Sequence, residues 1–406
     1  MTPAPDTAQD TAPHDAAMAA PAASSGGHGL VIVGGGVQGV TLALEAARRG
    51  LSPVLLERDR IGGATSAAWY RILHGGFRYL QSLDLVRTRE SSAERRRFLG
   101  FAPDLVRPHP FLLPLHGEGL KRPAALRAAF ALERMVTPDR NRGLPPDRRI
   151  GPGRVLSPDA ARRVYPAIRT EGLKGAALWQ DAVASDEGRL LDRLRETAVA
   201  AGARLVEGAE ATALLSDDGR VAGVGTADGR TWRAPRVVNA AGPWSAEVAA
   251  RFGVPAPELF RPALAFNLLL DRPPLSDAGL GVSVPGRPGA PTLFLMPMDG
   301  LTFAGTWYAP RTALDPVPTE AEIDAFLAEL DAAAPALGAT RRDVVRVFAG
   351  LQPATAPGGT DIGDRPVVVN HGAAGGPRGA WSLSGVKWTT AWRVSSGLLD
   401  RIVSDP

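Results

Sequence analysis

The chain has 406 residues, enough for one large or two closely packed domains, and its 45% of apolar residues allow a sizeable core. It has no cysteine, which excludes disulfides, thiolate metal sites and a cofactor attached through a cysteine thioether. Its six histidines show no metal-ligand spacing, so we expect no metal. The net charge of +4 comes without a basic helix that carries interleaved aromatics, which disfavours nucleic acid as a partner.

Residues 1–27 form the first distinct segment. They are rich in Ala, Pro, Thr and Asp and hold no Lys or Arg, so they lack the basic start and apolar core of a signal peptide. We therefore expect a disordered tail over 1–27. The chain contains no run of about 18 apolar residues, which predicts no membrane span and, with the absence of cysteine, favours a cytoplasmic protein.

The stretch 30–57 has the order strand, glycine-rich turn, helix, strand. An apolar β-branched run over 30–33 predicts a buried parallel strand, and it leads into a G-x-G-x-x-G pattern made by Gly34, Gly36 and Gly39. In such a unit the first glycine allows the tight turn, the second lets a pyrophosphate approach the backbone, and the third lets helix and strand pack closely. Glu57 ends the second strand, where its carboxylate can bind both hydroxyls of an unphosphorylated ribose. The stretch predicts a dinucleotide site at a helix N-terminus.

Two further motifs follow, Gly63-Ala64-Thr65-Ser66 and Leu73-His74-Gly75-Gly76-Phe77-Arg78-Tyr79-Leu80. With the glycine-rich turn they resemble FAD-dependent glycerol-3-phosphate dehydrogenases, which belong to the D-amino-acid oxidase-like (DAO) flavoprotein superfamily. The resemblance covers about residues 29–403, implies FAD as cofactor, and indicates a short form without the C-terminal helical domain of many members. It implies that the Thr-Ser pair lies on the pyrophosphate side, that the His-Gly-Gly segment passes the isoalloxazine, and that Arg78 and Tyr79 face the substrate.

Two later motifs match the same family. Asn239-Ala240-Ala241-Gly242-Pro243-Trp244 implies a strand that returns to the nucleotide domain and ends beside the cofactor. The segment 383–390 resembles the family's Gly-Gly-Lys-x-Thr-Thr, and it implies a helix N-terminus that stabilises negative charge on the reduced ring, with Lys387 and Thr389 at the ring edge. The cofactor-binding residues that the resemblance implies are Gly34, Gly36, Val37, Gln38, Gly39, Glu57, Arg58, Thr65, Ser66, His74, Gly75, Gly76, Ala211, Ala241, Gly242, Gly385, Val386, Lys387, Trp388 and Thr389.

The expected fold is α/β, of the glutathione-reductase-2 or DAO type, with a Rossmann-like FAD-binding domain and a substrate domain built on a mixed or antiparallel sheet. Both domains are expected to be discontinuous. The FAD-binding domain is expected to comprise 28–80, 155–250 and 340–406, and the substrate domain 81–154 and 251–339. The segment 175–185 is itself predicted to be a strand of the second domain.

The segment 121–154 is strongly basic. An amphipathic basic helix around Phe130, Leu132 and Met135 could dock on a membrane, as family members that feed electrons to quinone do through the equivalent region. We favour instead an arginine-rich, solvated surface, because the apolar content is modest.

Two positions depart from the family pattern. Asn267 stands where the family has a histidine near the flavin, and an asparagine cannot serve as a general base. Gln352 replaces the arginine of a phosphate-binding Gly-x-Arg-Pro, and about 1.5–3 kcal/mol of charge-assisted contact would be lost, which Arg365 would offset in part. These changes disfavour glycerol 3-phosphate as substrate. We predict His74, Arg78 and Lys387 as catalytic residues, and as substrate-binding residues Tyr79, Asn267, Tyr308, Gln352 and Arg365.

The sequence thus predicts an FAD-dependent enzyme that oxidises a C–OH bond of a small polyol, sugar, cyclitol or hydroxy acid, with or without a phosphate. Hydride passes to flavin N5 while His74 takes the hydroxyl proton. Oxygen, a quinone and a carrier protein stay open as electron acceptors, and peripheral membrane contact is not favoured. Two alternatives remain: an amine or amino-acid oxidase that acts on a C–N bond and needs no strong base, and a catalytically silent nucleotide-binding scaffold.

Overall fold

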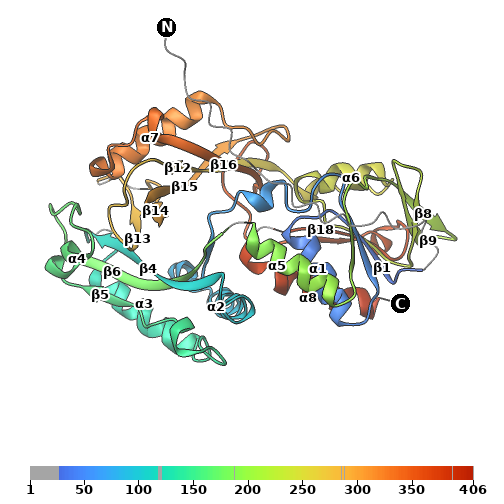
Figure 1. Cartoon of the computed structure of the whole chain (residues 1–406), viewed down its shortest axis with the longest axis horizontal. Coiled ribbons are helices and arrows are strands. Elements are labelled where there is room, and N and C mark those ends of the chain that lie inside the picture. The colour runs from blue at the N-terminus through green and yellow to red at the C-terminus, as the bar shows by residue number, and fades with distance from the viewer. Residues whose placement is uncertain are drawn as a thin grey trace, which may run out of the picture.

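The structure is a computed structural model, and it describes residues 27–117, 121–186, 188–284, 286–287, 289–385 and 387–405, with only the backbone of Gln81. The tail predicted over 1–27 lies outside the described residues except for Gly27, and Val386 also lies outside them. The described chain folds into two lobes that lie side by side (Figure 1).

A six-stranded sheet forms the centre of the first lobe. Its order is β17-β18-β11-β1-β2-β7, and all neighbours pair in parallel except β17 and β18. The apolar run of β1 is buried on both faces, with Leu30 and Ile32 in one core and Val31 and Val33 in the other, as expected of a central parallel strand. The strands are β1 (Leu30–Val33), β2 (Pro53–Leu56), β7 (Arg204–Val206), β11 (Val237–Asn239), β17 (Val367–Asn370) and β18 (Ala380–Ser384).

Helices cover the first face of this sheet and a small sheet covers the second. Helix α1 (Val37–Arg48) lies against α5 (Arg189–Ala200) and α8 (Ala391–Ser404), and the three share one core (Figure 1). The opposite core holds α6 (Ser245–Arg251) and a three-stranded antiparallel sheet of β8 (Ala211–Asp217), β9 (Arg220–Thr226) and β10 (Thr231–Arg233).

The second lobe is built on a nine-stranded mixed sheet. Along its length the order is β16-β12-β15-β14-β13-β4-β6-β3, and β5 pairs beside β6. Helix α7 (Glu320–Ala333) packs on one face through Phe326, and a capping box between Thr319 and Glu322 fixes its start. Helix α4 (Pro158–Val164) lies beside β6. The strands are β3 (Ile72–Leu73), β4 (Val106–Leu115), β5 (Arg154–Leu156), β6 (Gly175–Ala184), β12 (Pro262–Leu270), β13 (Gly279–Val282), β14 (Leu293–Met298), β15 (Leu301–Pro310) and β16 (Val344–Pro353).

Helix α2 (Leu85–Phe101) joins the lobes, and α3 (Pro123–Val136) packs beside it on the second lobe. Helix α2 packs Phe98 and Leu99 into the core of the first lobe. Helix α3, in the basic segment, buries Phe130 against Phe77 with ring centroids 4.7 Å apart, whereas Met135 is 78% exposed. Among the helices of the described residues, none combines the length and the apolar content that crossing a bilayer requires.

The structure corrects the expected domain boundaries. The strands β3 and β16 and most of β5 lie in ranges expected for the FAD-binding domain, but they pair within the large sheet. Helix α2 was expected in the substrate domain, but it packs on the nucleotide lobe. The physical reason is that β6 pairs with β4 over ten residues and β16 with β12 along its length, and such nonlocal pairing leaves no mark in a short apolar segment. The expectation that 175–185 is a strand of the second domain is met by β6.

Candidate active site

The glycine-rich turn lies where the six-stranded sheet changes the direction in which strands are added. From the central β1 the chain adds β2 and β7 on one side and β11 and β18 on the other. In such a sheet, ligands bind in the crevice outside the carboxyl ends of the strands at this switch point. The segment after β1 and the segment after β11 meet there, because Ala240 N donates to the Val33 carbonyl oxygen.

The three glycines of the turn have different reasons to be glycine. Gly34 has a φ of +108°, and a Cβ there would lie 2.6 Å from the Ala240 carbonyl oxygen. A Cβ at Gly39 would lie 1.9 Å from the Gly34 carbonyl oxygen. At Gly36, however, a Cβ would meet only Ser66 Oγ, at 3.2 Å. The packing of the chain itself therefore requires the first and third glycines, whereas the second leaves the backbone accessible to a ligand.

The carboxylate of Glu57 is fixed at the end of β2. Its Oε2 accepts from Gly35 N at 2.6 Å and its Oε1 accepts from Asp59 N at 2.9 Å. Beside it, the guanidinium of Arg58 lies 4.6 Å from the centre of the Trp244 ring, so the segment after β2 contacts the segment after β11. Glu57 and Arg58 thus border the same crevice as the glycines.

The Thr-Ser pair links the glycine-rich turn to the second lobe. Ser66 Oγ accepts from Val37 N at 2.9 Å, at the first residue of α1, while Thr65 Oγ1 accepts from Leu351 N of β16 at 3.3 Å. Trp388 Nε1 donates to the Ser66 carbonyl oxygen at 3.3 Å. Both predicted residues therefore lie at the start of α1, and Thr65 also fixes the edge strand of the large sheet.

The starts of α1 and α8 lie together. Gln38 Nε2 donates to the Lys387 carbonyl oxygen at 3.4 Å, and a Cβ at Gly385 would lie 2.3 Å from Gln38 Cδ. The residues between this turn and α8 are packed inward, since Trp388 and Thr389 are both buried and Trp388 stacks on Trp69 at 4.3 Å. Two helix N-termini thus face one region, where their dipoles favour a negative group.

These features fit FAD. Gly36 presents a backbone without a side chain, α1 begins without a side-chain cap from its own N-cap residue, and Gln38 Oε1 is buried without a hydrogen-bond partner among the described residues. The pyrophosphate would be held by Gly36 and Gln38, the ribose by Glu57, and the flavin edge by the start of α8.

His74 is positioned by strand pairing. It directly follows β3, whose Leu73 pairs with Ala182 of β6, so the antiparallel register sets His74 opposite Asp181. The side chain of His74 is 56% exposed, and its Nδ1 lies 3.9 Å from Asp181 Oδ2. The next two residues are glycines for a reason that the sequence did not indicate: a Cβ at Gly75 would lie 2.0 Å from Arg95 Nη1, and Gly76 has a φ of +84°.

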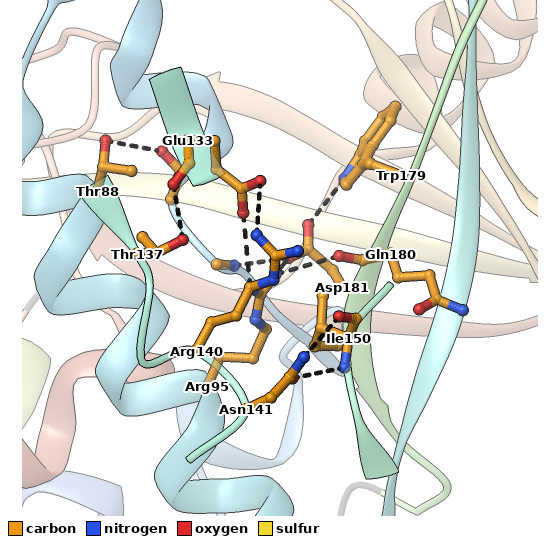
Figure 2. A network of polar contacts seen from close by, with 12 residues as sticks. Thr88, Arg95, Glu133, Thr137, Arg140, Asn141, Ile150, Trp179, Gln180 and Asp181 are labelled. Atoms are coloured by element: carbon orange, nitrogen blue, oxygen red, sulfur yellow. Dashed lines mark hydrogen bonds and ion pairs between the residues drawn. The ribbon is translucent and has the colours of Figure 1, made fainter. Parts of the chain in front are cut away.

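Asp181 is the centre of a buried polar network (Figure 2). Its Oδ1 accepts from Gly75 N at 2.6 Å and from Arg95 Nη1 at 2.7 Å, and its Oδ2 accepts from Trp179 Nε1 at 3.0 Å. Burial alone would raise the pKa of the Asp181 carboxyl, but contact with His74 and the charge of Arg95 outweigh it and bring that pKa to about 2. Asp181 is therefore a buried, ionised carboxylate directly behind His74.

Arg78 and Tyr79 reach the first lobe through a cluster of charges. Lys387 Nζ donates to the Tyr79 hydroxyl and lies 3.9 Å from Asp364 Oδ1, while Arg87 Nη1 lies 2.9 Å from Asp364 Oδ2. The hydrogen bond from Arg87 leads the effects that hold the pKa of Asp364 below its usual range, and the charges of Lys387 and Arg78 add to it. The structure thus brings together three predicted residues, Arg78, Tyr79 and Lys387.

Tyr308 also lies near Arg78. Burial of its hydroxyl raises the pKa of Tyr308, and the nearby positive charge of Arg78 lowers it in part. Arg365 is exposed next to Asp364, and Gln352 is half-buried near the end of the edge strand β16, where its backbone pairs with Ala263.

Asn267 has a structural use for both ends of its amide. It is 3% exposed, its Nδ2 donates to the Ala68 carbonyl oxygen at 3.2 Å, and its Oδ1 accepts from Thr306 Oγ1 at 2.8 Å. Asn267 therefore ties β12 to β15 and to the segment after the Thr-Ser pair, through one hydrogen bond at each end of its amide.

The remaining predicted cofactor residues lie at different depths in the first lobe. Ala241 and Gly242 follow β11 in the crevice, and Gly242 has a φ of +57°. Ala211 begins β8 and is buried in the core beneath the sheet, where its carbonyl oxygen accepts from Arg251 Nη1 at 3.2 Å. Val386 is not among the described residues.

Sequence reasoning missed three residues of this site: Asp181, Arg95 and Asp364. The sequence did point to Asp181, because it is the single charged residue in the strand Gly175–Ala184. A charge in an apolar strand is stable only beside a group that pairs with it. Arg95 had none, since it stands in a run of three arginines on α2, of which it alone is buried. Asp364 could be suspected only from its position next to Arg365.

The two-lobed fold, with its dinucleotide crevice and a histidine-bearing segment between the lobes, defines a flavin-binding oxidoreductase. The family comparison agrees. The family model described as FAD dependent oxidoreductase (DAO) matches residues 30–393, and the chain belongs to this family. The predictions of an α/β fold of this type, of FAD as cofactor and of an oxidoreductase activity are therefore confirmed.

Curated relatives carry names from the same family. The chain is 31% identical to glycerol-3-phosphate dehydrogenase 1 of Mycobacterium tuberculosis, over 97% of this chain and 77% of that protein. It is 27% identical to the alpha-glycerophosphate oxidase of Lactococcus lactis, over 80% of this chain and 54% of that enzyme.

Solved structures share the fold. The glycerol-3-phosphate dehydrogenase of Bacillus halodurans, solved in complex with FAD, superposes with a TM-score of 0.68 over 93% of this chain and 64% of that chain, at 21% identity. The glycine oxidase of Bacillus cereus gives a TM-score of 0.67 over 93% of this chain and 96% of that chain, at 18% identity.

Proposed function

We propose that this FAD-dependent oxidoreductase oxidises a C–OH bond of a small polyol that carries an anionic group such as a phosphate. The observation that carries the proposal is the segment 74–79. It presents a histidine backed by a buried carboxylate and, four and five residues on, an arginine and a tyrosine that lie beside a lysine of the other lobe. The names of the curated relatives support the same reaction class.

The cations of this region would select an anionic substrate. Arg78 is exposed, and it lies close enough to Asp364 and Tyr308 for its charge to act on both. Arg87, by contrast, is already held by Asp84 and Asp364. Arg78 therefore has the capacity to bind a phosphate or carboxylate in two parallel hydrogen bonds, with Tyr308 nearby.

His74 would move the proton. With Nδ1 directed at Asp181, its Nε2 is the nitrogen left to accept a proton from the substrate hydroxyl. FAD, when bound, supplies the acceptor for the hydride that leaves the same carbon. The O–H bond and the C–H bond of the alcohol are broken, and the product is a carbonyl compound. Asn267 is not the proton acceptor, since an amide is not a base, and its amide also bonds Ala68 and Thr306.

The test is an anaerobic titration of the purified yellow protein with a matched panel: glycerol 3-phosphate, glycerol, a hydroxy acid, and an amine of similar size. We expect bleaching of the flavin band near 450 nm by an anionic polyol and none by the amine. Bleaching by the amine alone would overturn the C–OH assignment in favour of C–N oxidation. Reoxidation of the reduced protein with oxygen and with a soluble quinone would then separate the candidate electron acceptors.

A further inference from the structure

Asp181 lies behind the proposed base and is 4% exposed. We propose that Asp181 is a positioning residue: it holds the His74 imidazole with the proton on Nδ1, so that Nε2 faces the substrate as the acceptor. The role rests on the proposed function of His74, but the orientation of the ring is a property of the protein alone.

The backbone brings the two side chains together. The register of β3 with β6, Ile72 with Val183 and Leu73 with Ala182, sets position 74 opposite position 181. The hydrogen bond from Gly75 N to Asp181 Oδ1 at 2.6 Å then ties the residue after His74 to the same carboxylate. The histidine backbone is thus fixed to the group that its ring faces.

The carboxylate is held by groups on several elements (Figure 2). From α2, Arg95 donates to Asp181 Oδ1 at 2.7 Å and to the Gln180 carbonyl oxygen at 3.1 Å. From α3, Glu133 lies 4.0 Å from Arg95 Nη2, and Arg140 lies 3.6 Å from Glu133. From β4, His109 pairs with Asp181 across the sheet, and burial lowers the pKa of His109 to about 4, so this neighbour stays neutral.

Both oxygens of the Asp181 carboxylate have hydrogen-bond donors from the chain, and Oδ2 also faces the His74 ring. Asp181 Oδ1 has two donors, and Oδ2 has Trp179 Nε1 at 3.0 Å and His74 Nδ1 at 3.9 Å. An ionised carboxylate only accepts hydrogen bonds, and at 3.9 Å its negative charge favours the tautomer whose proton is on the facing nitrogen, Nδ1. A carboxylate–histidine pair of this kind selects the tautomer and stabilises the imidazolium that forms during proton transfer.

The network could instead serve only to bury Arg95, and a pair of isosteric variants separates the two roles. Asp181→Asn removes the charge and the acceptor that face His74. Glu133→Gln removes a charge from the same network without touching His74, and it is the matched control. Both variants must retain bound flavin and a cooperative thermal transition.

The first readout is NMR of protein labelled with ¹⁵N-histidine, with His74 assigned from the spectrum of His74→Gln. We expect the neutral His74 of the wild type to carry its proton on Nδ1, and we expect Asp181→Asn, but not Glu133→Gln, to shift it toward Nε2. A wild-type ring with its proton on Nε2 would overturn the proposal even if Asp181→Asn failed to fold. So would an equal shift in Glu133→Gln.

The second readout uses whichever substrate bleaches the flavin. Asp181→Asn should lower kcat by roughly 10- to 100-fold with a much smaller change in KM. The acid limb of its pH–rate profile should move to lower pH, because the imidazolium loses the carboxylate that stabilises it. An unmoved limb with an unchanged kcat would reduce Asp181 to a structural role. If no polyol is oxidised, the proposed function fails, while the NMR result still decides the role of Asp181.

Discussion

The dinucleotide crevice, here called the nucleotide end of the site, and the region around His74, here called its charged end, are built in different ways. The nucleotide end is made of backbone: Gly34, Gly36 and Glu57 act through an absent side chain or through contacts with main-chain N–H groups. The end around His74 is made of side-chain charges, with Asp181 and Arg95 both buried. A backbone site can be encoded in one continuous motif, whereas a charged site needs partners from several elements. Substitutions should therefore act differently at the two ends.

The largest contrast is expected within the glycine-rich turn. Gly36→Val should abolish FAD binding but keep the fold, because a Cβ there meets only Ser66 Oγ at 3.2 Å. Gly39→Val should lose the fold, since its Cβ would lie 1.9 Å from the Gly34 carbonyl oxygen. The measurements are the flavin absorbance of the purified protein and its thermal transition. A fully yellow Gly36→Val protein would contradict the placement of the pyrophosphate.

At the charged end, Arg78→Ala should leave flavin binding unchanged and weaken the binding of the substrate. Losing a charge-assisted contact of about 1.5–3 kcal/mol corresponds to a rise in KM of roughly 10- to 150-fold. Arg89→Ala is the control, because Arg89 is an exposed arginine on α2 that donates to the Val136 carbonyl oxygen and lies 3.9 Å from Asp139. Equal KM values for the two variants in steady-state assays would return Arg78 to a structural role.

A substitution that strengthens phosphate binding would test the charged end in the opposite direction. Gln352→Arg should lower KM for a phosphorylated polyol by about 10-fold and leave its unphosphorylated counterpart unchanged, because a guanidinium adds one charge-assisted contact. The ratio of kcat/KM for glycerol 3-phosphate and glycerol measures this effect. A ratio that stays the same would show that position 352 lies outside the phosphate-binding part of the site.

The smallest effect is expected at Glu94, on α2. Burial raises the pKa of Glu94, which accepts from Arg393 N of α8 at 3.1 Å, to about 7. Because this folded pKa exceeds that of the unfolded chain, near 4.3, the folded state binds more protons between these values, and its stability falls as pH rises from about 4.5 to 7.

Urea unfolding across that pH range should show a decline of about 1–3 kcal/mol in the free energy of unfolding of the wild type relative to that of Glu94→Gln. Other titrating groups, such as His109 and Glu133, are common to both proteins and cancel in this difference. Glu90→Gln, on the same helix and paired with Arg393 at 2.6 Å, should keep the decline. A difference between wild type and Glu94→Gln that stays constant across this pH range would contradict the raised pKa of Glu94. The carboxyl of Asp181 does not interfere, because its lowered pKa affects stability only below about pH 4.

Sequence reasoning found most of the nucleotide end and part of the charged end. The unit from β1 to Glu57 was identified from local order alone, because each glycine and the terminal acid have a role within one βαβ segment. His74, Arg78 and Lys387 were proposed from a resemblance, and the structure places Arg78 and Lys387 in one charge cluster. Asn267 was expected at the substrate, whereas the structure uses its amide to hold Ala68 and Thr306.

The sequence by itself determined the position of the dinucleotide crevice, because it depends on backbone conformations that adjacent residues decide, and its resemblance to a known family gave FAD and the fold class. Only the tertiary structure decided which strands share the large sheet, why Gly75 is a glycine, and that Asp181 and Arg95 lie behind His74. A buried charge is stable only beside a partner, and the partners of Asp181 lie on α2 and on the loop after β3, far away in the chain. Pairing between distant strands, which carries no local signal, brings them together.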